Sequence, residues 1–491
     1  MLIYKIHPAI GVARVGNHPS AFFIGPETTG HPGVEIAGDG SETKIVQHKD
    51  GGKIKRQAAR FRIYEYDQDN AGALTLKREI TAADAQIEWK VDLVNRKAAL
   101  DRDLPQGIDP EIAPQPRNTD ITGGARNGLI IQDPRDRKIS GANQPAVAFD
   151  QGKFLGTTVY LGELRTDAKG RLVVLGGHGV SASVPPMEPL VSFANNDRWH
   201  DDVADGPVTA TITFPGQAAR TVESPAWVTV APPDFAPGVG GVVTLYDVAT
   251  QAAIDAGFVK PAAKPSFLQH IWPVIERASN LRFVHARFQI WNNLPRDRAA
   301  LASTASDTQT KQLRQTVFDV IVTNIDNVLR DAIIPDFLAQ YFAQYRDGDF
   351  TSDLDNPPPA ASEPANLDRA VLEACVGLNF FPGIEASQNM RHEGNYAEFG
   401  RFNHQAAEVF PGFLTEVMAV PWQADFLDCN GEWWPSQRPD VVMTNPDQIP
   451  ASKTPWAGTI GTHQGMVDLF GTRPFVAPAV SSTGEQVFVQ E

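Results

Sequence analysis

The segment GTTVYLGELRTDAKGRLVVLGG, residues 156–177, contains two apolar runs of strand length and is typical of a β-rich protein. Three similar segments follow: PVTATITF at 207–214, AWVTVAPPDF at 226–235 and GVVTLYDV at 241–248. Toward the N-terminus, FRIYEYD at 61–67 and AQIEWKVDLVN at 85–95 continue the pattern, broken by Gly and Pro. Residues 1–250 are therefore predicted to form a β-rich N-terminal region.

Residues 101–142 interrupt this pattern. They are polar, contain several prolines and have few large apolar side chains. We therefore expect a surface excursion or linker there.

The composition changes after residue 250. Residues 308–345 repeat apolar side chains at three- and four-residue spacing, with Pro335 as an interruption, which predicts two successive amphipathic helices. After a proline-rich stretch at 355–364, DRAVLEACVGLNFF at 368–381 predicts a short helix that delivers Cys375. We expect an α+β, mainly β fold, with a helical and loop-rich C-terminal region, residues 251–491, that carries the site.

The bulk composition excludes several functional classes. A net charge of −15 over 491 residues argues against nucleic acid, whose binding requires a basic face. No window approaches the roughly 18 apolar residues of a membrane span, and the N-terminus has no ordinary signal peptide. We expect a soluble protein, either cytoplasmic or exported by another route.

The usual cofactor motifs are missing from the sequence. There is no GxGxxG after a strand, no GxxxxGK[ST] and no HExxH. The acidic segment WHDDVADGP at 199–207 has the oxygen ligands that calcium prefers, but a turn in which Asp side chains bond their own backbone explains it better. No metal site is predicted.

The C-terminal third concentrates rare residues. Three tryptophans and both cysteines of the chain lie in ACVGLNFFPGIEAS at 374–387, AVPWQADFLDC at 419–429 and GEWWPSQRPD at 431–440. An aromatic core under loops would explain the tryptophans. A disulfide between Cys375 and Cys429 would explain the cysteines, although a chain with two cysteines cannot be a disulfide scaffold.

Long segments throughout the chain resemble one family. HPAIGVARVGN at 7–17, FFIGPE at 22–27, IEWKVDLVNRKAA, LGELRTDAKGRLVVLGGHG, NNDRWHDDVADGPV, AWVTVAPPDFAPG and the three C-terminal segments are similar to L-lysine ε-oxidases and their glycine oxidase relatives. The resemblance implies an oxidase of a primary amine or amino acid whose cofactor, cysteine tryptophylquinone, forms by a thioether between a cysteine and an oxidised tryptophan of the same chain.

The resemblance also assigns the cofactor residues. Cys375 occupies the position of the crosslinking cysteine, and motif position favours Trp422 over Trp433 or Trp434 as the tryptophan. The quinone carbonyl would form a Schiff base with the substrate amine, and dioxygen would reoxidise the cofactor, giving aldehyde or oxo acid, ammonia and hydrogen peroxide. A flavoprotein partner would be needed for maturation, and a homo-oligomer is compatible with the sequence.

The sequence constrains the groups that transfer protons less than it constrains the cofactor residues. Arg391, His392, Tyr396 and His404 follow the FFPGIE motif and are predicted to face the same cavity, with His392 and Asp425 as candidate catalytic groups.

One position departs from the family, which has an aspartate four residues before the cysteine where this chain has Val371. The nearest acids are Asp368, two helical turns back, and Glu373. Either Asp425 or another acid replaces the aspartate, or the quinone does not form and the chain acts as a binding or scaffold protein. A related enzyme acting on a peptide-bound amine is a third alternative.

Overall fold

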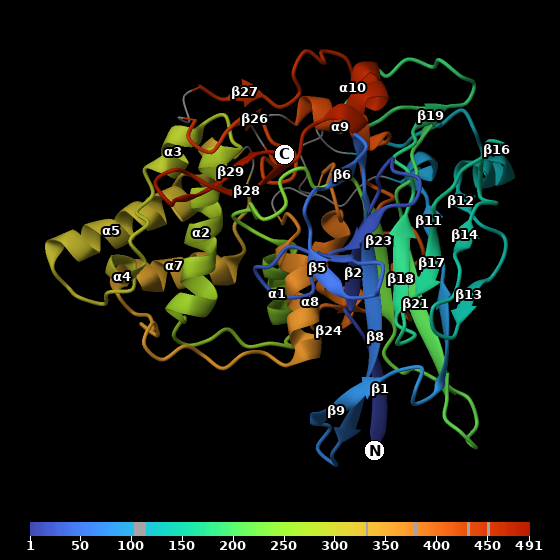
Figure 1. Cartoon of the computed structure of the whole chain (residues 1–491), viewed down its shortest axis with the longest axis horizontal. Coiled ribbons are helices and arrows are strands. Elements are labelled where there is room, and N and C mark those ends of the chain that lie inside the picture. Colours follow the sequence, from blue (N-terminus) through green and yellow to red (C-terminus); the bar gives the residue numbers. More distant parts are fainter. Residues whose placement is uncertain (103–113, 330–331, 378–380, 430–432, 449–451) are drawn as a thin grey trace.

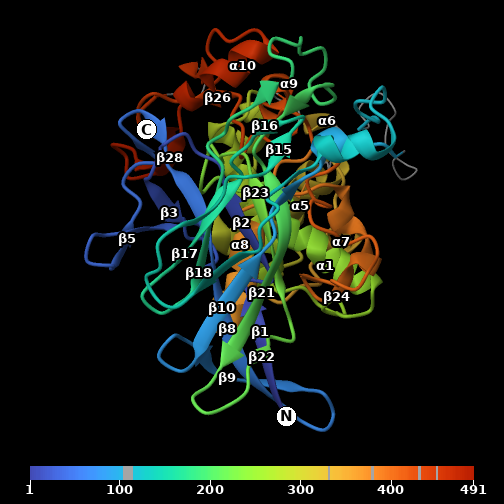
Figure 2. The same ribbon diagram turned by 90° about the vertical axis from the view of Figure 1, so that its right-hand side faces the viewer.

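The computed structural model describes residues 1–102, 114–329, 332–377, 381–429, 433–448 and 452–491. Its dominant feature is one large sheet that joins 17 strands among these residues. Helices of the C-terminal half cover one side of this sheet, and the N-terminus lies at the end of the sheet that is far from the C-terminus (Figures 1 and 2). The predicted fold, with a β-rich N-terminal half and a helical, loop-rich C-terminal region, is confirmed.

The strands that organise the sheet are β1 (Leu2–His7), β2 (Ile10–Arg14), β3 (Phe22–Ile24), β8 (Arg56–Gln68), β10 (Gln86–Val91), β18 (Leu172–Gly176), β21 (Ala204–Thr213) and β23 (Ala226–Ala231). Most pair antiparallel, but β2 runs parallel to β23 and β3 runs parallel to β8. Along β21 buried residues alternate with half-buried ones, whereas β2 and β23 are buried at every residue. The parallel pair β2 and β23 is therefore buried on both faces of the sheet.

The local predictions in the N-terminal half have mixed outcomes. FRIYEYD lies in β8, and IEWKV and VN lie in β10 and β11 (Val94–Asn95), as expected. The predicted excursion at 101–142 is partly wrong, because β12 (Ile131–Gln132) and β13 (Arg137–Ser140) belong to the sheet, while residues 103–113 lie outside the described residues.

The strand predicted at GVVTLYDV is wrong. Helix α1 (Leu245–Asp255) begins within it, because Thr244 and Asp247 form a capping box in which each side chain bonds the other residue's backbone N–H. An apolar run of this length suits a buried helix start as well as a strand, and the cap decides between them.

The helices of the C-terminal half include α1, α2 (Trp272–Asn280), α5 (Thr308–Phe318), α7 (Asp336–Asp347), α8 (Glu363–Glu373), α9 (Trp422–Asp428) and α10 (His463–Leu469). The two helices predicted at 308–345 are α5 and α7, with α7 starting directly after Pro335 as expected for a residue that cannot continue a helix. Among the described residues, no helix is long and apolar enough to cross a membrane.

Helix α8 covers only the first part of the helix predicted at 368–381, because it ends at Glu373, before Cys375, and residues 378–380 lie outside the described residues. It packs on β2. Its Asp368 accepts hydrogen bonds from the backbone N–H of Ala9 at 2.7 Å and lies 2.9 Å from Nδ1 of His7. These bonds hold the helix against the sheet and so fix where its C-terminal end, with Cys375, lies. The largest apolar cluster continues from the sheet into the helices, and the division at residue 250 stays a prediction.

Candidate active site

Cys375 follows directly after α8 and is buried. Its backbone carbonyl accepts from the N–H of Leu245 at 3.1 Å, and its thiol donates to the carbonyl of Val371 at 3.2 Å. Burial raises the pKa of the thiol well above its ordinary value, and the charge of Glu385 raises it further. At neutral pH the group is therefore a thiol rather than a thiolate.

Two charged side chains meet at this sulfur. Nη2 of Arg14, the last residue of β2, lies 3.9 Å from Sγ of Cys375 and 2.7 Å from Oε1 of Glu385. The carbonyl of Glu385 is held by the hydroxyl of Thr229 on β23, at 2.9 Å. The parallel strands β2 and β23 therefore position the pair, and the Arg14 and Glu385 side chains are 4% and 0% exposed.

Asp234 lies just beyond β23, beside the same arginine. Burial raises its pKa to about 6, although the charge of Arg14 opposes the shift. Asp234, Arg14 and Cys375 line a cavity of about 990 Å³, together with Val371, Ala374 and Gln437. A carboxylate, a guanidinium and a thiol thus share one cavity large enough for an amino acid.

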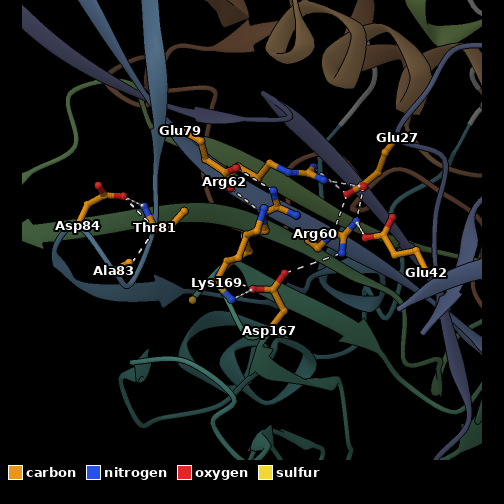
Figure 3. Close-up of polar contacts among 12 residues, drawn as sticks. Glu27, Glu42, Arg60, Arg62, Glu79, Thr81, Ala83, Asp84, Asp167 and Lys169 are labelled. Atoms are coloured by element: carbon orange, nitrogen blue, oxygen red, sulfur yellow. Dashed lines mark hydrogen bonds and ion pairs between the residues drawn. The ribbon is translucent and has the colours of Figure 1, made fainter. Parts of the chain in front are cut away.

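The lining of the cavity also includes Glu27 and Arg60, which belong to a network of charged side chains (Figure 3). Nη1 and Nη2 of Arg62 donate to the two oxygens of Glu27 at 2.9 and 2.7 Å, and Nε of Arg60 donates to Oε1 at 2.9 Å. Arg60 also lies 2.6 Å from Glu42 and 3.8 Å from Asp167. Because acids already surround Arg60, this part of the lining is built to hold the wall together rather than to bind a substrate anion.

The predicted tryptophan, Trp422, begins α9. Its ring contacts Phe426 and Phe470 with centroids 4.9 and 5.2 Å away, and its backbone N–H donates to Asp201 at 3.2 Å. Within the described part of the chain, no polar or ring contact joins Trp422 to Cys375, and Trp422 is not among the residues that line the cavity.

Trp433 belongs to a segment that contacts the residue before the cysteine. Four residues later, Gln437 lies beside Ala374, with Nε2 3.5 Å from the Ala374 carbonyl oxygen. The Trp433 ring contacts Phe193 at 5.9 Å, and Phe193 contacts Phe381 of the FFPGIE motif at 6.0 Å. Packing therefore places the neighbourhood of Trp433, rather than that of Trp422, against the backbone next to Cys375.

Asp425 is buried on α9, and burial raises its pKa well above its ordinary value. The charges that act on it are Asp428, Arg438 and Lys97, and it acts in turn on Cys429. Asp425 therefore lies with the second cysteine rather than with the first. Both cysteines are free, so the alternative of a disulfide between them is wrong.

The four residues after the FFPGIE motif do not line the cavity around Cys375. Arg391 and His392 are exposed, Tyr396 donates its hydroxyl to the Met390 carbonyl, and His404 packs on Trp227. Arg391 and His392 thus lie at the surface and Tyr396 and His404 pack on other parts of the fold, so the structure does not bring the four residues to this cavity.

The other acids near Cys375 in sequence also have structural partners. Asp368 binds His7, and Glu373 forms an ion pair with Arg369 at 2.7 Å. Both acids are therefore engaged in structural ion pairs rather than placed to substitute for the missing helical aspartate.

The segment WHDDVADGP has a structural role, but the predicted turn is wrong, because its Asp side chains bond distant parts of the chain rather than their own backbone. Asp205 accepts from Trp227 Nε1 and from the backbone N–H and hydroxyl of Thr415, and Asp202 accepts from the N–H of Val180 at 3.0 Å. No group of side chains able to hold a metal ion is found among the residues that the structure describes.

Asp202 should make stability depend on pH. Burial raises its pKa to about 7, so the folded state binds this proton more firmly than the unfolded state. Its contribution to stability is present at low pH and is lost as pH rises from about 4 to 7, by up to about 1.4 kcal/mol per pH unit. Asp202→Asn keeps the acceptor for Val180 and should remove this slope from the free energy of unfolding measured by denaturant titration. Asp150→Asn is the control, since its side chain is 48% exposed; equal slopes in both variants would contradict the assignment.

The residues that sequence reasoning missed are Arg14, Asp234 and Glu385. Each lies in a segment quoted for the family resemblance, HPAIGVARVGN, AWVTVAPPDFAPG and FFPGIE. For Arg14 the available signal was a charged residue inside an otherwise apolar, strand-like run, since buried charges need partners.

Known proteins share both halves of this architecture. The chain matches the family descriptions L-lysine epsilon oxidase N-terminal over residues 7–230 and L-lysine epsilon oxidase C-terminal domain over residues 322–447. It is 26% identical to the L-lysine 6-oxidase of Marinomonas mediterranea over 554 aligned positions, which cover 92% of this chain and 74% of that protein.

Solved structures agree on the fold. The crystal structure of the Schiff base intermediate of L-Lys ε-oxidase from Marinomonas mediterranea with L-Lys has a TM-score of 0.79 at 22% identity, covering 99% of this chain and 94% of that one. A second crystal structure, of the L-Lys ε-oxidase from Marinomonas mediterranea, has a TM-score of 0.78 at 22% identity and covers the same shares of both chains. Since the two family matches together span most of the sequence, this chain belongs to the L-lysine ε-oxidase family.

Proposed function

We propose that this chain is an oxidase of a primary amine or amino acid, with a cysteine tryptophylquinone that includes Cys375, and that it releases aldehyde or oxo acid, ammonia and hydrogen peroxide. The observation that carries the proposal is a buried free thiol on the wall of a 990 Å³ cavity, beside Arg14 and Asp234. The relatives named for L-lysine support an amino-acid substrate.

The residues present fit this cofactor. Cys375 has no disulfide partner, and the indole Nε1 atoms of Trp422 and Trp433 are both buried without a hydrogen-bond partner, so either ring can be oxidised without loss of a bond. The packing of Gln437 on Ala374 favours Trp433 as the partner of Cys375, whereas motif position favours Trp422. When formed, the quinone supplies an electrophilic carbonyl and accepts two electrons.

Asp234 is the proposed general base. Its pKa of about 6 leaves it ionised at neutral pH but still basic enough to take a proton from the substrate carbon that bears the nitrogen. Arg14 stays charged, because Glu385 and the neighbouring acids raise its pKa above the ordinary value. If Trp422 is the modified residue, Asp425, three residues later on the same helix, is the alternative base.

The test is a peptide mass spectrum of the chain produced together with its flavoprotein maturation partner, followed by a peroxide-release screen. A Cys375 peptide joined to a tryptophan peptide with two added oxygens, together with peroxide from free amino acids, supports the proposal and names the tryptophan. Peroxide only from peptide-bound amines would assign the other enzyme class. An unmodified Cys375 with the partner present would favour the binding or scaffold function, for which the loss of the helical aspartate at Val371 is the specific observation.

A further inference from the structure

The contacts of Glu385 leave one of its atoms unexplained. Its Oε1 binds Arg14, but Oε2 is fully buried and has no hydrogen-bond partner among the described residues. A buried carboxylate oxygen normally has a donor, since an unsatisfied one costs free energy. The chain therefore keeps a buried proton-accepting atom on the carboxylate that shares Arg14 with Cys375.

Arg14 joins this carboxylate to the sulfur, because its Nη2 lies 2.7 Å from Oε1 of Glu385 and 3.9 Å from Sγ of Cys375. Among the charged groups, Glu385 shifts the pKa of the Cys375 thiol more than Arg14 or Asp234 does. Burial raises the pKa of Glu385 itself, while Arg14 and the peptide N–H of Val376, the residue after Cys375, oppose that shift. These three groups, Arg14 from β2, Asp234 from beyond β23 and Glu385, are the charges that act on the thiol.

The carbonyl oxygen that accepts a hydrogen bond from the thiol is a weak base. The thiol donates to the carbonyl of Val371, one helical turn earlier, and an amide carbonyl does not take the proton away. A thiol must lose its proton to react as a nucleophile.

We propose that Glu385 accepts the proton of Cys375 when its sulfur bonds to the tryptophan, and that Arg14 holds the resulting thiolate. This inference rests on the proposed function and assigns the acid that matures its cofactor. The S–H bond breaks with its electron pair left on sulfur, and an O–H bond forms at Oε2, so neither group is oxidised or reduced. The carbon–sulfur bond then forms with loss of two electrons and a proton from the indole, and the oxidant is dioxygen acting through the maturation flavoprotein.

This transfer is feasible inside the protein because it moves charge without adding any. Before the transfer the anion is the carboxylate, and afterwards it is the thiolate. Both lie within 4 Å of the same atom, Nη2 of Arg14. The buried site keeps its net charge, so the large cost of desolvating a new ion does not arise.

Glu385→Gln tests the proposal, with Glu163→Gln as the matched control. Glu163 is also a buried glutamate that pairs with a buried arginine of the sheet, Arg56, at 3.4 Å. Each variant is produced with the maturation flavoprotein, and the crosslinked fraction of Cys375 is measured by peptide mass spectrometry. We expect Glu163→Gln to crosslink like the wild type. Glu385→Gln should crosslink at least roughly ten-fold less, because it lacks the proton-transfer group, and Glu385→Asp should recover part of the crosslinking.

A second measurement does not depend on the quinone. In chains made without the flavoprotein and with Cys429 replaced by alanine, the ultraviolet absorbance of the thiolate is titrated against pH. Removal of the Glu385 charge should lower the pKa of Cys375 by about one pH unit or more, whereas Glu163→Gln should leave it unchanged.

The outcomes separate the two proposals. A crosslinked wild type with an equally crosslinked Glu385→Gln overturns the role of Glu385 alone, and so does a thiol pKa that Glu385→Gln does not change. A wild type that never crosslinks overturns the proposed function and this role with it. Equal melting temperatures of the glutamine variants exclude misfolding as the cause of a lost crosslink.

Discussion

Replacement of Cys375 by alanine will give a folded chain with no crosslink, no visible colour and no peroxide release. The loss should be complete, because a cofactor built from a side chain cannot form without that side chain. The fold should persist, since a buried cysteine behaves as a small apolar group and its truncation costs roughly 1 kcal/mol. Peptide mass spectrometry, the visible spectrum and a peroxide assay measure the three effects.

Cys429→Ala is the matched control for this experiment. It removes the other cysteine of the chain, which is equally buried. Crosslink, colour and turnover should all survive in this variant. Turnover in Cys375→Ala would show that the chemistry does not use Cys375, and loss of turnover in Cys429→Ala would show that the effect is not specific to Cys375.

Loss of the buried charge at Lys97 should cause the largest decrease in stability. Nζ of Lys97 lies 2.8 Å from Oδ2 of Asp201 and donates to the carbonyl of Ala419 at 2.8 Å, and both charged side chains are 0% exposed. The same Asp201 oxygen accepts from the backbone N–H of Trp422. Lys97→Met leaves this carboxylate buried without its counter-charge, which costs about 3–5 kcal/mol.

The measurement is the free energy of unfolding by denaturant titration at pH 7. Lys138→Met is the control, because its pair with Glu88 at 3.0 Å is 44% exposed on both sides and should contribute less than about 1 kcal/mol. The double variant Lys97→Met with Asp201→Leu should regain most of the loss, since apolar replacement of a whole buried pair is often neutral. A Lys97→Met decrease no larger than that of Lys138→Met would show that the pair does not hold these segments together.

This pair also explains how the two halves of the chain are joined. Lys97 follows β11 of the sheet, whereas Ala419 and Trp422 belong to the C-terminal region. The loop before α9 is therefore anchored on a buried cation of the N-terminal half. The aromatic cluster of that region, Trp422 with Phe426 and Phe470, gains its fixed position from this anchor.

The sequence by itself determined the fold class and the family, and the assignment of Cys375 to the cofactor stays a prediction. Strands such as β8 and helices such as α8 follow from apolar spacing along the chain, and spacing is a local property that packing preserves. The motif around Cys375 is continuous in sequence, so the resemblance locates it directly. Even the error at residues 241–248 was local, because the Thr244 and Asp247 cap that starts α1 is present in the sequence.

Only the tertiary structure decided what surrounds that cysteine. Arg14 is 361 residues from Cys375 and 371 from Glu385, and they meet because the parallel pairing of β2 with β23 and the packing of α8 on β2 bring them together. The structure also moved His392 to the surface and Asp425 to the second cysteine. Burial and the distances between charges set these roles, and both depend on residues far apart in the chain, which spacing along the sequence does not record.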